Sequence, residues 1–247
     1  MPQIRVTTLG AGDAFGSGGR HHTAILLQGE TTTLLVDPGP CVMSMLKRAK
    51  VPLQTIDIIL VTHLHGDHIA GFPFMLLEYQ FISKRDKPLQ IVGPEGTEQR
   101  LEGFAGLMYK EVEASRRNFA IEYRSVKPAE QVRLGDVRVT VFPMVHTPLE
   151  ICLGYTVQIE GKTIALSGDT IWCESVSAMS RGADLLLLDC TYYDLDIPVH
   201  LNYLEFVRRE SELSAKRVVL THAGENLLQN KEKVKHRIAD DGETFVI

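Results

Sequence analysis

The sequence predicts an αββα sandwich, in which two β-sheets face one another and helices cover both outer faces. The first observation is the order of the apolar segments. Strand-like segments come first, helix-like segments cover them, and the same order is repeated in the second half of the chain. The second is composition: 44% of the 247 residues are hydrophobic and 23% are charged, which suits a globular chain with one large core. No linker or repeat divides the chain, so we expect one domain over residues 1–247.

The elements of the first half follow from the spacing of apolar residues. Segments with the pattern of strands lie at Ile4–Leu9, Ala24–Gln28, Thr33–Val36, Ile56–Val61 and, more briefly, Ile91–Val92. The glycine-rich stretch from Gly10 to Gly19 is the loop after the first of them. Apolar residues recur at helical spacing over 42–49, and Pro52 ends that helix. Further helices are expected at His68–Phe81, disturbed at Pro73, and at Gly96–Val112.

The second half begins with strands that tight turns connect. They are expected within Val132–Val145, Cys152–Ile159 and Thr163–Leu166, with Gly161-Lys162 at one turn. Two nearly continuous apolar segments, Leu185–Leu188 and Val218–Leu220, predict buried strands. Helical patterns lie around Leu201–Leu213 and Asn226–Ile238, where they would cover the second sheet.

The most informative stretch is His63-Leu64-His65-Gly66-Asp67-His68, directly after the apolar segment Ile56–Val61. Its imidazoles and carboxylate are costly to bury unless they are paired or bind a metal. Alternation along an extended chain points His63 and His65 the same way, while Gly66 lets the backbone turn and aim the second pair at a neighbouring point. The pattern favours two metal ions. The alternative is a polar turn in which Thr62 and Asp67 cap a helix.

Further ligands stand at the ends of other predicted strands. His146, Asp169 and His222 each follow a short β-type segment and precede a small or turn-forming residue. Such positions expose side chains to a cleft in a sheet protein. Taken singly, either histidine is explained as an ordinary core or surface residue, but their joint recurrence favours a metal centre.

With these residues the chain resembles the metallo-β-lactamase fold superfamily, and within it the branch of ribonuclease Z and related phosphodiesterases. The match runs over nearly the whole chain and includes Asp37 in Leu35-Val36-Asp37-Pro38-Gly39. The resemblance implies one metal held by His63, His65 and His146, a second held by Asp67, His68 and His222, and Asp169 as the bridge. It implies that Asp37 orients a ligand, because metal-bound histidines usually donate their other N–H to such a group. A turn residue before Pro38-Gly39 is the alternative.

Two bridged ions predict a metal-dependent hydrolase. They would activate a shared water molecule and stabilise charge that develops on the substrate. The nitrogen-rich ligand set suits zinc, and the mixed set with carboxylates also accepts manganese or iron. True β-lactamases of the superfamily carry a cysteine where Asp169 stands, so antibiotic hydrolysis is not expected.

The predicted catalytic residues are Asp67, within the metal centre, and His200. His200 should open a helix beside the cleft and protonate the leaving alkoxide of a phosphodiester. Ribonuclease Z relatives have a histidine at the corresponding place, usually followed by Ser-Thr, whereas Leu201-Asn202 follow here. A solvated histidine near a helix start is the alternative.

We expect a small phosphodiester as substrate and not tRNA. Ribonuclease Z enzymes carry a long tRNA-gripping arm between the motifs of His146 and Asp169, but residues 147–168 hold only two strands and a turn. RNA binding also requires basic surface, and the formal net charge is -5. The best basic candidate, Arg116-Arg117, is also explained by a solvated helix end.

Alternative readings concern the substrate and one loop. A lactonase or thioesterase would use the same dimetal site on a carbonyl, and a ribonuclease Z-like endonuclease would use it on RNA. The loop of residues 16–22 should lie at the mouth of the site, where Arg20, His21 or His22 would meet a substrate anion. The sequence equally supports the alternative that residues 16–22 form a flexible surface loop.

The remaining features concern location and partners. The chain enters a strand pattern without a basic and an apolar leader, and no apolar stretch approaches the roughly 18 residues of a membrane span. We therefore expect a cytoplasmic protein with a small-molecule substrate and no membrane partner; a homodimer is compatible with the sequence. The four scattered cysteines are expected to be reduced and mostly buried.

Overall fold

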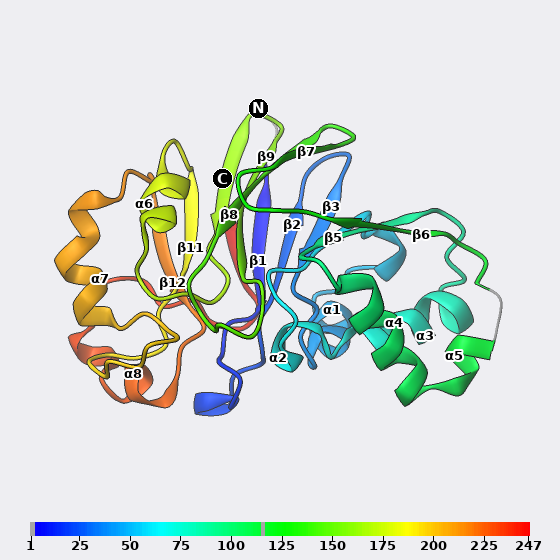
Figure 1. Cartoon of the computed structure of the whole chain (residues 1–247), viewed down its shortest axis with the longest axis horizontal. Coiled ribbons are helices and arrows are strands. Elements are labelled where there is room, and N and C mark those ends of the chain that lie inside the picture. Colours follow the sequence, from blue (N-terminus) through cyan, green and yellow to red (C-terminus); the bar gives the residue numbers. More distant parts are fainter. Residues whose placement is uncertain (1–2, 115–116) are drawn as a thin grey trace.

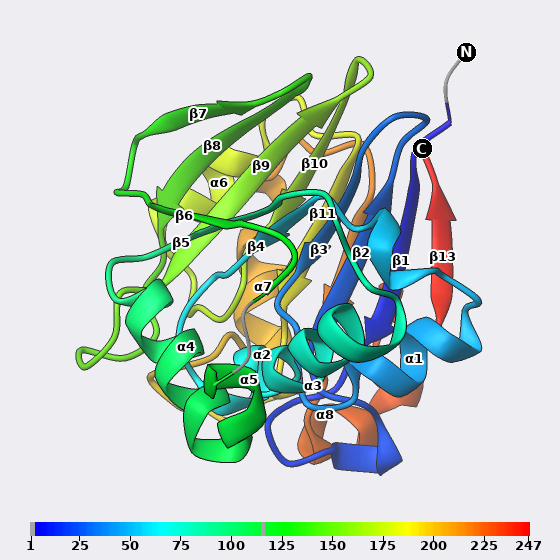
Figure 2. The same ribbon diagram turned by 90° about the vertical axis from the view of Figure 1, so that its right-hand side faces the viewer.

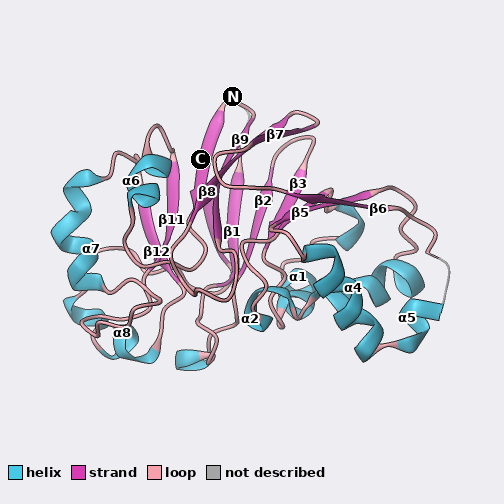
Figure 3. Ribbon diagram, viewed as in Figure 1, coloured by secondary structure: helices cyan, strands magenta, loops and turns pink. Residues whose placement is uncertain are grey.

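Two β-sheets lie face to face between two layers of helices in the computed structural model, which confirms the predicted αββα sandwich (Figure 1). The structure describes residues 3–114 and 117–247. Arg116 of the predicted basic pair therefore lies outside the described residues. Figure 3 shows the helices on the two outer faces and the strands between them. No helix in the described part of the chain is long and apolar enough to cross a membrane.

The first sheet has seven strands, and its parallel part positions the site. In spatial order the strands are β13 (Glu243–Val246), β1 (Arg5–Gly10), β2 (Ala24–Gln28), β3 (Thr33–Val36), β4 (Ile58–Leu60), β5 (Leu89–Gly93) and β6 (Ile121–Ser125). Strands β3 to β6 are parallel, so their carboxyl ends share one edge. Asp37 follows β3 and the ligand cluster of residues 63–68 follows β4 at this edge.

The second sheet has six strands and contributes ligands from the same edge. In spatial order they are β12 (Val218–Thr221), β11 (Leu185–Asp189), β10 (Lys162–Leu166), β9 (Leu153–Ile159), β8 (Val137–Pro143) and β7 (Gln131–Leu134). Strands β10, β11 and β12 are parallel, and their carboxyl ends lead to Asp169, Asp189 and His222. The two sheets are joined beside the ligand loop, because Tyr155 Oη donates to Val61 O at 2.6 Å and Leu153 N to Thr62 O at 2.9 Å.

Helices cover each sheet on its outer side. The first sheet carries α1 (Val42–Arg48), α2 (Gly66–Ile69), α3 (Phe72–Leu77), α4 (Thr97–Met108) and α5 (Lys110–Ala114). The second carries α6 (Glu174–Ser180), α7 (Tyr203–Arg209) and α8 (Glu225–Gln229), seen on the left of Figure 1. Three apolar clusters fill the spaces between the layers: one between the sheets, around Tyr155, and one under each helix layer, around Phe72 and Phe206. In Figure 2 the chain termini lie at one edge, where β13 pairs with β1.

Several predicted helices are shorter than the sequence pattern indicates. The expected helix 68–81 is divided into α2, α3 and a π-helical turn at Glu78–Ile82. The break falls at Ala70-Gly71, before Pro73, which sits in the first turn of α3 where its missing N–H costs nothing. The helix expected at 96–112 is broken at Tyr109, whose backbone is extended. The pattern over 226–238 gives only α8 and a 3₁₀ turn at Lys231–Lys233.

Candidate metal centre

The seven predicted ligands meet at the shared edge of the two sheets in two groups. His63, His65 and His146 form the first group, and Asp67, His68, Asp169 and His222 form the second. Within each group the donor atoms all lie within 4.8 Å of one another. We call them the first and second ligand groups. His65 is half-buried and Asp67 is partly exposed, whereas the other five residues are buried.

Asp169 lies between the two groups. Its Oδ2 atom is 3.3 Å from His68 Nε2 and 3.4 Å from His222 Nε2 in the second group. The same oxygen is 3.8 Å from His63 Nε2 and 3.9 Å from His146 Nε2 in the first group. A single carboxylate therefore faces ligands of both groups, which is the arrangement that a bridging ligand requires.

The donor set fits divalent metal ions. The Nε2 atoms of His63 and His68 are buried, and among the described residues none offers them a partner that meets hydrogen-bond geometry. Buried polar atoms without such partners are rare in folded proteins, and a bound cation would satisfy both. Imidazole nitrogens together with carboxylate oxygens are ligands of zinc, manganese and iron. All four cysteines are free and none belongs to either group; Cys152 and Cys190 are buried, and the other two are half-buried.

The charges in the site are strongly coupled. Burial opposes ionisation of Asp169, but His222 and His68 outweigh this and hold its pKa well below the usual value. Burial likewise opposes a charge on His68, but Asp169 and Asp37 outweigh it and raise the pKa of His68. The pKa of His63 is lowered, by burial first and then by the charge of His68. The pocket is thus built around an ionised carboxylate that attracts cations.

A second set of residues orients the ligand rings. Asp37 Oδ2 lies 2.8 Å from His68 Nδ1, and both Asp37 oxygens also accept hydrogen bonds from Thr62. His146 Nδ1 lies 2.6 Å from Val199 O. His222 Nδ1 lies 3.0 Å from Thr191 Oγ1. With Nδ1 held in this way, Nε2 of each ring faces the ligand group, as in metal sites whose outer partners fix the ring orientation.

Three backbone positions at this edge have left-handed conformations. Asp37 has φ 55° and His222 has φ 59°, although neither is glycine. Gly168, directly before Asp169, has φ 59°, and an added Cβ there would meet Thr62 Cβ at 2.9 Å. Non-glycine residues persist in this region only where surrounding contacts hold them, and they concentrate at functional sites. These sharp turns direct the side chains of Asp37, Asp169 and His222 into the cleft.

His200 lies beside both groups, in the loop before α7. Its ring centroid is 4.7 Å from that of His146 and 4.9 Å from that of His222. Its Nδ1 is 2.9 Å from Asp189 Oδ2. Burial opposes a charge on His200, but Asp189 outweighs it and raises the pKa of His200 above its usual value. Asn202, not His200, caps α7, by accepting a bond from Glu205 N at 2.8 Å.

Asp189 is a site residue that the sequence reasoning missed. It ends the apolar strand β11 and is fully buried. The signal that marked His146, Asp169 and His222, a possible ligand after a short β-type segment, was also present at Leu185-Leu186-Leu187-Leu188-Asp189.

Two of the three loop residues predicted to meet a substrate anion, Arg20 and His21, contact the C-terminal segment. The Arg20 guanidinium contacts Ala239 O and Asp240, and His21 Nδ1 contacts Asp241 Oδ2 at 2.6 Å. His22 Nδ1 lies 3.8 Å from Cys41 Sγ. The end of the loop packs beside the second group, since Gly12 forms bridges with both His22 and Ala223, the residue after His222. The structure therefore brings the loop to the edge of the site but does not bring Arg20 or His21 to the ligands.

Fold, site and relatives together define a metal-dependent hydrolase with the metallo-β-lactamase fold. Ribonuclease Z of Methanosarcina acetivorans is 25% identical over 278 residues, covering 94% of this chain and 91% of that protein. The probable metallo-hydrolase YhfI of Bacillus subtilis is 28% identical over 225 residues, covering 89% of this chain and 86% of that one. Its crystal structure superposes with a TM-score of 0.81 at 23% identity over 100% of both chains. A diphosphatase from the PhnP family superposes with a TM-score of 0.77 at 21% identity, covering 98% and 97%.

Within this class, a family model described as Anti-Pycsar protein Apyc1 matches residues 4–245. The chain belongs to that family.

Proposed function

We propose that the protein hydrolyses small phosphodiesters with two bound divalent metal ions, most readily zinc. The observation that carries the proposal is the position of Asp169 between the two ligand groups. In this assignment His63, His65 and His146 would hold one ion, Asp67, His68 and His222 would hold the other, and Asp169 would serve both. The two ions would activate a water molecule and stabilise negative charge on the phosphoryl oxygens.

His200 supplies the proton in this proposal. Its Nδ1 is held by Asp189, so Nε2 is the ring nitrogen that gives a proton to the departing alkoxide. The carboxylate of Asp189 is itself fixed, because it accepts bonds from Thr170 N at 2.9 Å and Thr191 Oγ1 at 2.9 Å. His200 lines a cavity of about 400 Å³ together with Trp172 and Asn202, which gives a leaving group access to it. Asp67, partly exposed in the second group, is the ligand nearest to solvent on that side.

Charge and loop length favour a small substrate over tRNA. Residues 147–168 between His146 and Asp169 form a short loop followed by the hairpin of β9 and β10. The formal net charge is -5, and Arg117 of the predicted basic pair binds Glu102. Phosphate contacts, which supply most nucleic-acid affinity, require free cationic side chains. Relatives named ribonuclease Z and diphosphatase support hydrolysis at phosphorus in general.

Elemental analysis and a substrate panel test this proposal. Protein purified without chelator should contain close to two divalent ions per chain. It should hydrolyse bis-p-nitrophenyl phosphate and leave a tRNA precursor largely uncut. Asp169→Ala should lose metal and activity together, while Asp136→Asn, on a distant exposed turn, should lose neither. Rapid hydrolysis of acyl-lactones or thioesters without diesterase activity would replace the phosphodiester by a carbonyl substrate.

A further inference from the structure

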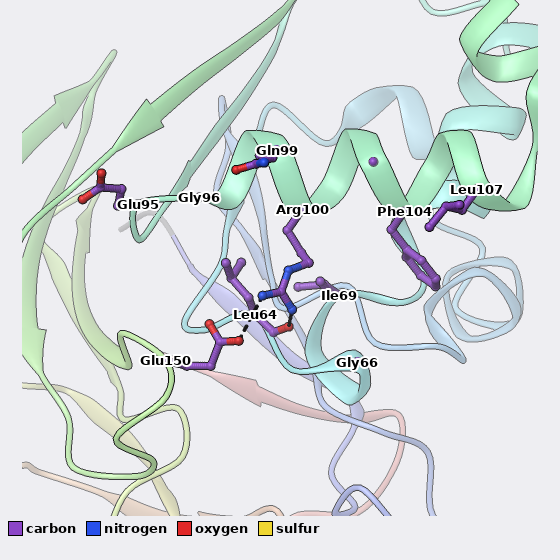
Figure 4. Close-up of a pocket in the computed structure, with 11 residues that line it drawn as sticks. Leu64, Gly66, Ile69, Glu95, Gly96, Gln99, Arg100, Phe104, Leu107 and Glu150 are labelled. Carbon is purple, nitrogen blue, oxygen red and sulfur yellow. Dashed lines mark hydrogen bonds and ion pairs between the residues drawn. The ribbon is translucent and has the colours of Figure 1, made fainter.

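A cavity of about 600 Å³ is lined by the two residues that flank the ligand His65 in sequence, Leu64 and Gly66 (Figure 4). These two residues form its inner end. Helix α4 forms its outer wall, and Glu150, on the loop that follows His146, closes one side. Two of the segments around this cavity therefore also carry ligands of the first group. We call this cavity the α4 pocket.

We propose that the α4 pocket binds the ester group that remains on phosphorus when the phosphodiester is cleaved, and that this group has an apolar or aromatic face. This inference rests on the proposed diesterase function. The α4 pocket would then select among diesters, and the residues at positions 103 and 107 would control this selectivity.

The walls of the α4 pocket match an apolar group. Leu64, Ile69 and Phe104 contribute aliphatic and aromatic surface. Leu107, which also lines the pocket, is 87% exposed. Gly103 faces the same space, and an added Cβ at this position would meet nothing within 4 Å. Apolar surface that is exposed inside a concave site is typical of ligand pockets.

Arg100 is the cationic residue of the pocket lining, which also includes the carboxylates of Glu95 and Glu150. Its Nη2 lies 3.1 Å from Glu150 Oε1, and its Nη1 lies 3.4 Å from Leu64 O, so the guanidinium is held against the ligand loop. The side chain is still 50% exposed. Figure 4 shows it between Leu64 and Glu150 at the inner end of the cavity. A diester bound between the ligand groups and the pocket would place its anionic phosphate near this cation.

The position of His200 decides which ester group enters the pocket. The group that leaves must lie near the proton donor, and His200 lines a different cavity, beside the second sheet and α7. The α4 pocket adjoins His65 on the first-sheet side. The group that stays on phosphorus is therefore the one directed into the α4 pocket.

A pair of chromogenic diesters with the same leaving group tests this inference. The probes are methyl p-nitrophenyl phosphate and 1-naphthyl p-nitrophenyl phosphate, which differ only in the group that stays on phosphorus. Wild type should show a lower KM for the naphthyl ester. Gly103→Leu fills the pocket and should raise that KM by about tenfold or more, while leaving kcat/KM for the methyl ester and the metal content unchanged. Gly103→Ala is the matched control, because it also replaces glycine by a better helix former but adds little volume to the pocket.

One further variant tests the pocket, and two outcomes separate the pocket assignment from the diesterase function on which it rests. Leu107→Ser, at an exposed position that folding does not require, should raise the naphthyl KM in the same direction. Equal effects of Gly103→Leu on both esters, or none on either, would overturn the pocket assignment while the diesterase function stands. No hydrolysis of either ester by metal-loaded wild type would overturn the proposed function and the pocket assignment with it.

Discussion

Asp189 is the carboxylate that connects the proposed proton donor to the second ligand group. One of its oxygens contacts His200 Nδ1 and Thr170 N, and the other accepts from Thr191 Oγ1. Thr191 Oγ1 in turn lies 3.0 Å from His222 Nδ1. Because the residue is fully buried, these bonds are strong and directional, and they fix both histidine rings at once.

Replacement of His200 separates proton donation from metal binding. His200→Ala should lower kcat by about 10²- to 10⁴-fold for a diester with an alkyl leaving group, because the alkoxide then departs without a proton. The decrease in kcat should be much smaller when the leaving group is p-nitrophenolate, which needs no proton. Steady-state kinetics with both substrates measure the difference, and elemental analysis should find both ions retained.

The control for this variant is a histidine away from the ligand groups. His236 Nδ1 lies 2.9 Å from Tyr203 Oη on the outer side of the second sheet. His236→Ala should leave the ratio between the two leaving groups unchanged. Equal losses for both leaving groups in His200→Ala would remove His200 from proton transfer and leave it a positioning residue.

The ligands could be predicted from sequence because they follow strands and are dense in sequence. His63 to His68 form a local cluster, and His146, Asp169 and His222 each follow a strand. The contacts of Thr62 and Thr191 with ligand histidines could not be predicted. No local sequence pattern distinguishes a threonine that contacts a histidine ring from one that does not. The partner of Arg20 could not be predicted either, because its ion pair with Asp240 depends on the C-terminal segment, far away in sequence.

At the scale of elements, α4 combines a pocket wall with an anchor to the sheet edge. Glu102 of α4 accepts from Arg117 Nη1 at 2.7 Å and from Tyr123 Oη at 2.6 Å. Tyr123 lies on β6, the outermost strand of the first sheet. Burial opposes ionisation of Glu102, but the bonds from Arg117 and Tyr123 outweigh it and lower the pKa of Glu102.

This lowered pKa predicts a pH dependence of stability. A carboxyl whose pKa is lower in the folded chain than in the unfolded chain favours folding when it is ionised. Its contribution is complete above the unfolded value near 4.5 and disappears as the pH falls through the folded pKa. Urea unfolding of wild type and Glu102→Gln should therefore differ by about 1 to 3 kcal/mol at pH 7, and the difference should shrink below pH 4.5.

Glu98→Gln, on an exposed part of the same helix, is the control for this prediction. It should change the free energy of unfolding by a few tenths of a kcal/mol, as expected for a surface position. A Glu102→Gln difference that is the same at pH 7 and pH 3.5 would show that packing, and not the ionised carboxylate, accounts for the loss.

Elements with clear apolar periodicity were predicted, and those without it were missed. Strands β2 and β3 were predicted with the bounds that the structure gives. Strand β6 was missed because its sequence, Ile121-Glu122-Tyr123-Arg124-Ser125, is half polar and lies at a sheet edge. Strand β13 has only one buried residue, Phe245, and pairs with β1 from the opposite end of the chain. Helix α6 contains several serines, which are weak helix formers.

At the scale of the whole molecule, the candidate metal centre joins the two halves of the sandwich. His63, His65, Asp67 and His68 belong to the first half, and His146, Asp169 and His222 belong to the second. Direct hydrogen bonds also join the halves at this edge, such as those from Tyr155 Oη to Val61 O and from Leu153 N to Thr62 O. Bound metal ions would therefore link the two sheets in addition to their part in hydrolysis.

Metal removal should accordingly destabilise the fold. A ligand that binds only the folded state stabilises it by RT ln(1 + [L]/Kd), or about 2.7 kcal/mol at a hundredfold excess over Kd. For a chain of this size, that loss corresponds to a decrease in Tm of roughly 5 to 10 °C. Calorimetry before and after chelation should show this decrease, and added zinc or manganese should reverse it. Asp169→Ala, which removes the ligand common to both groups, should lack the response to chelator and metal, whereas Asp136→Asn should retain it. A wild-type Tm that does not respond to chelator, in protein shown by elemental analysis to have lost its metal, would mean that the protein contacts alone hold the two halves together.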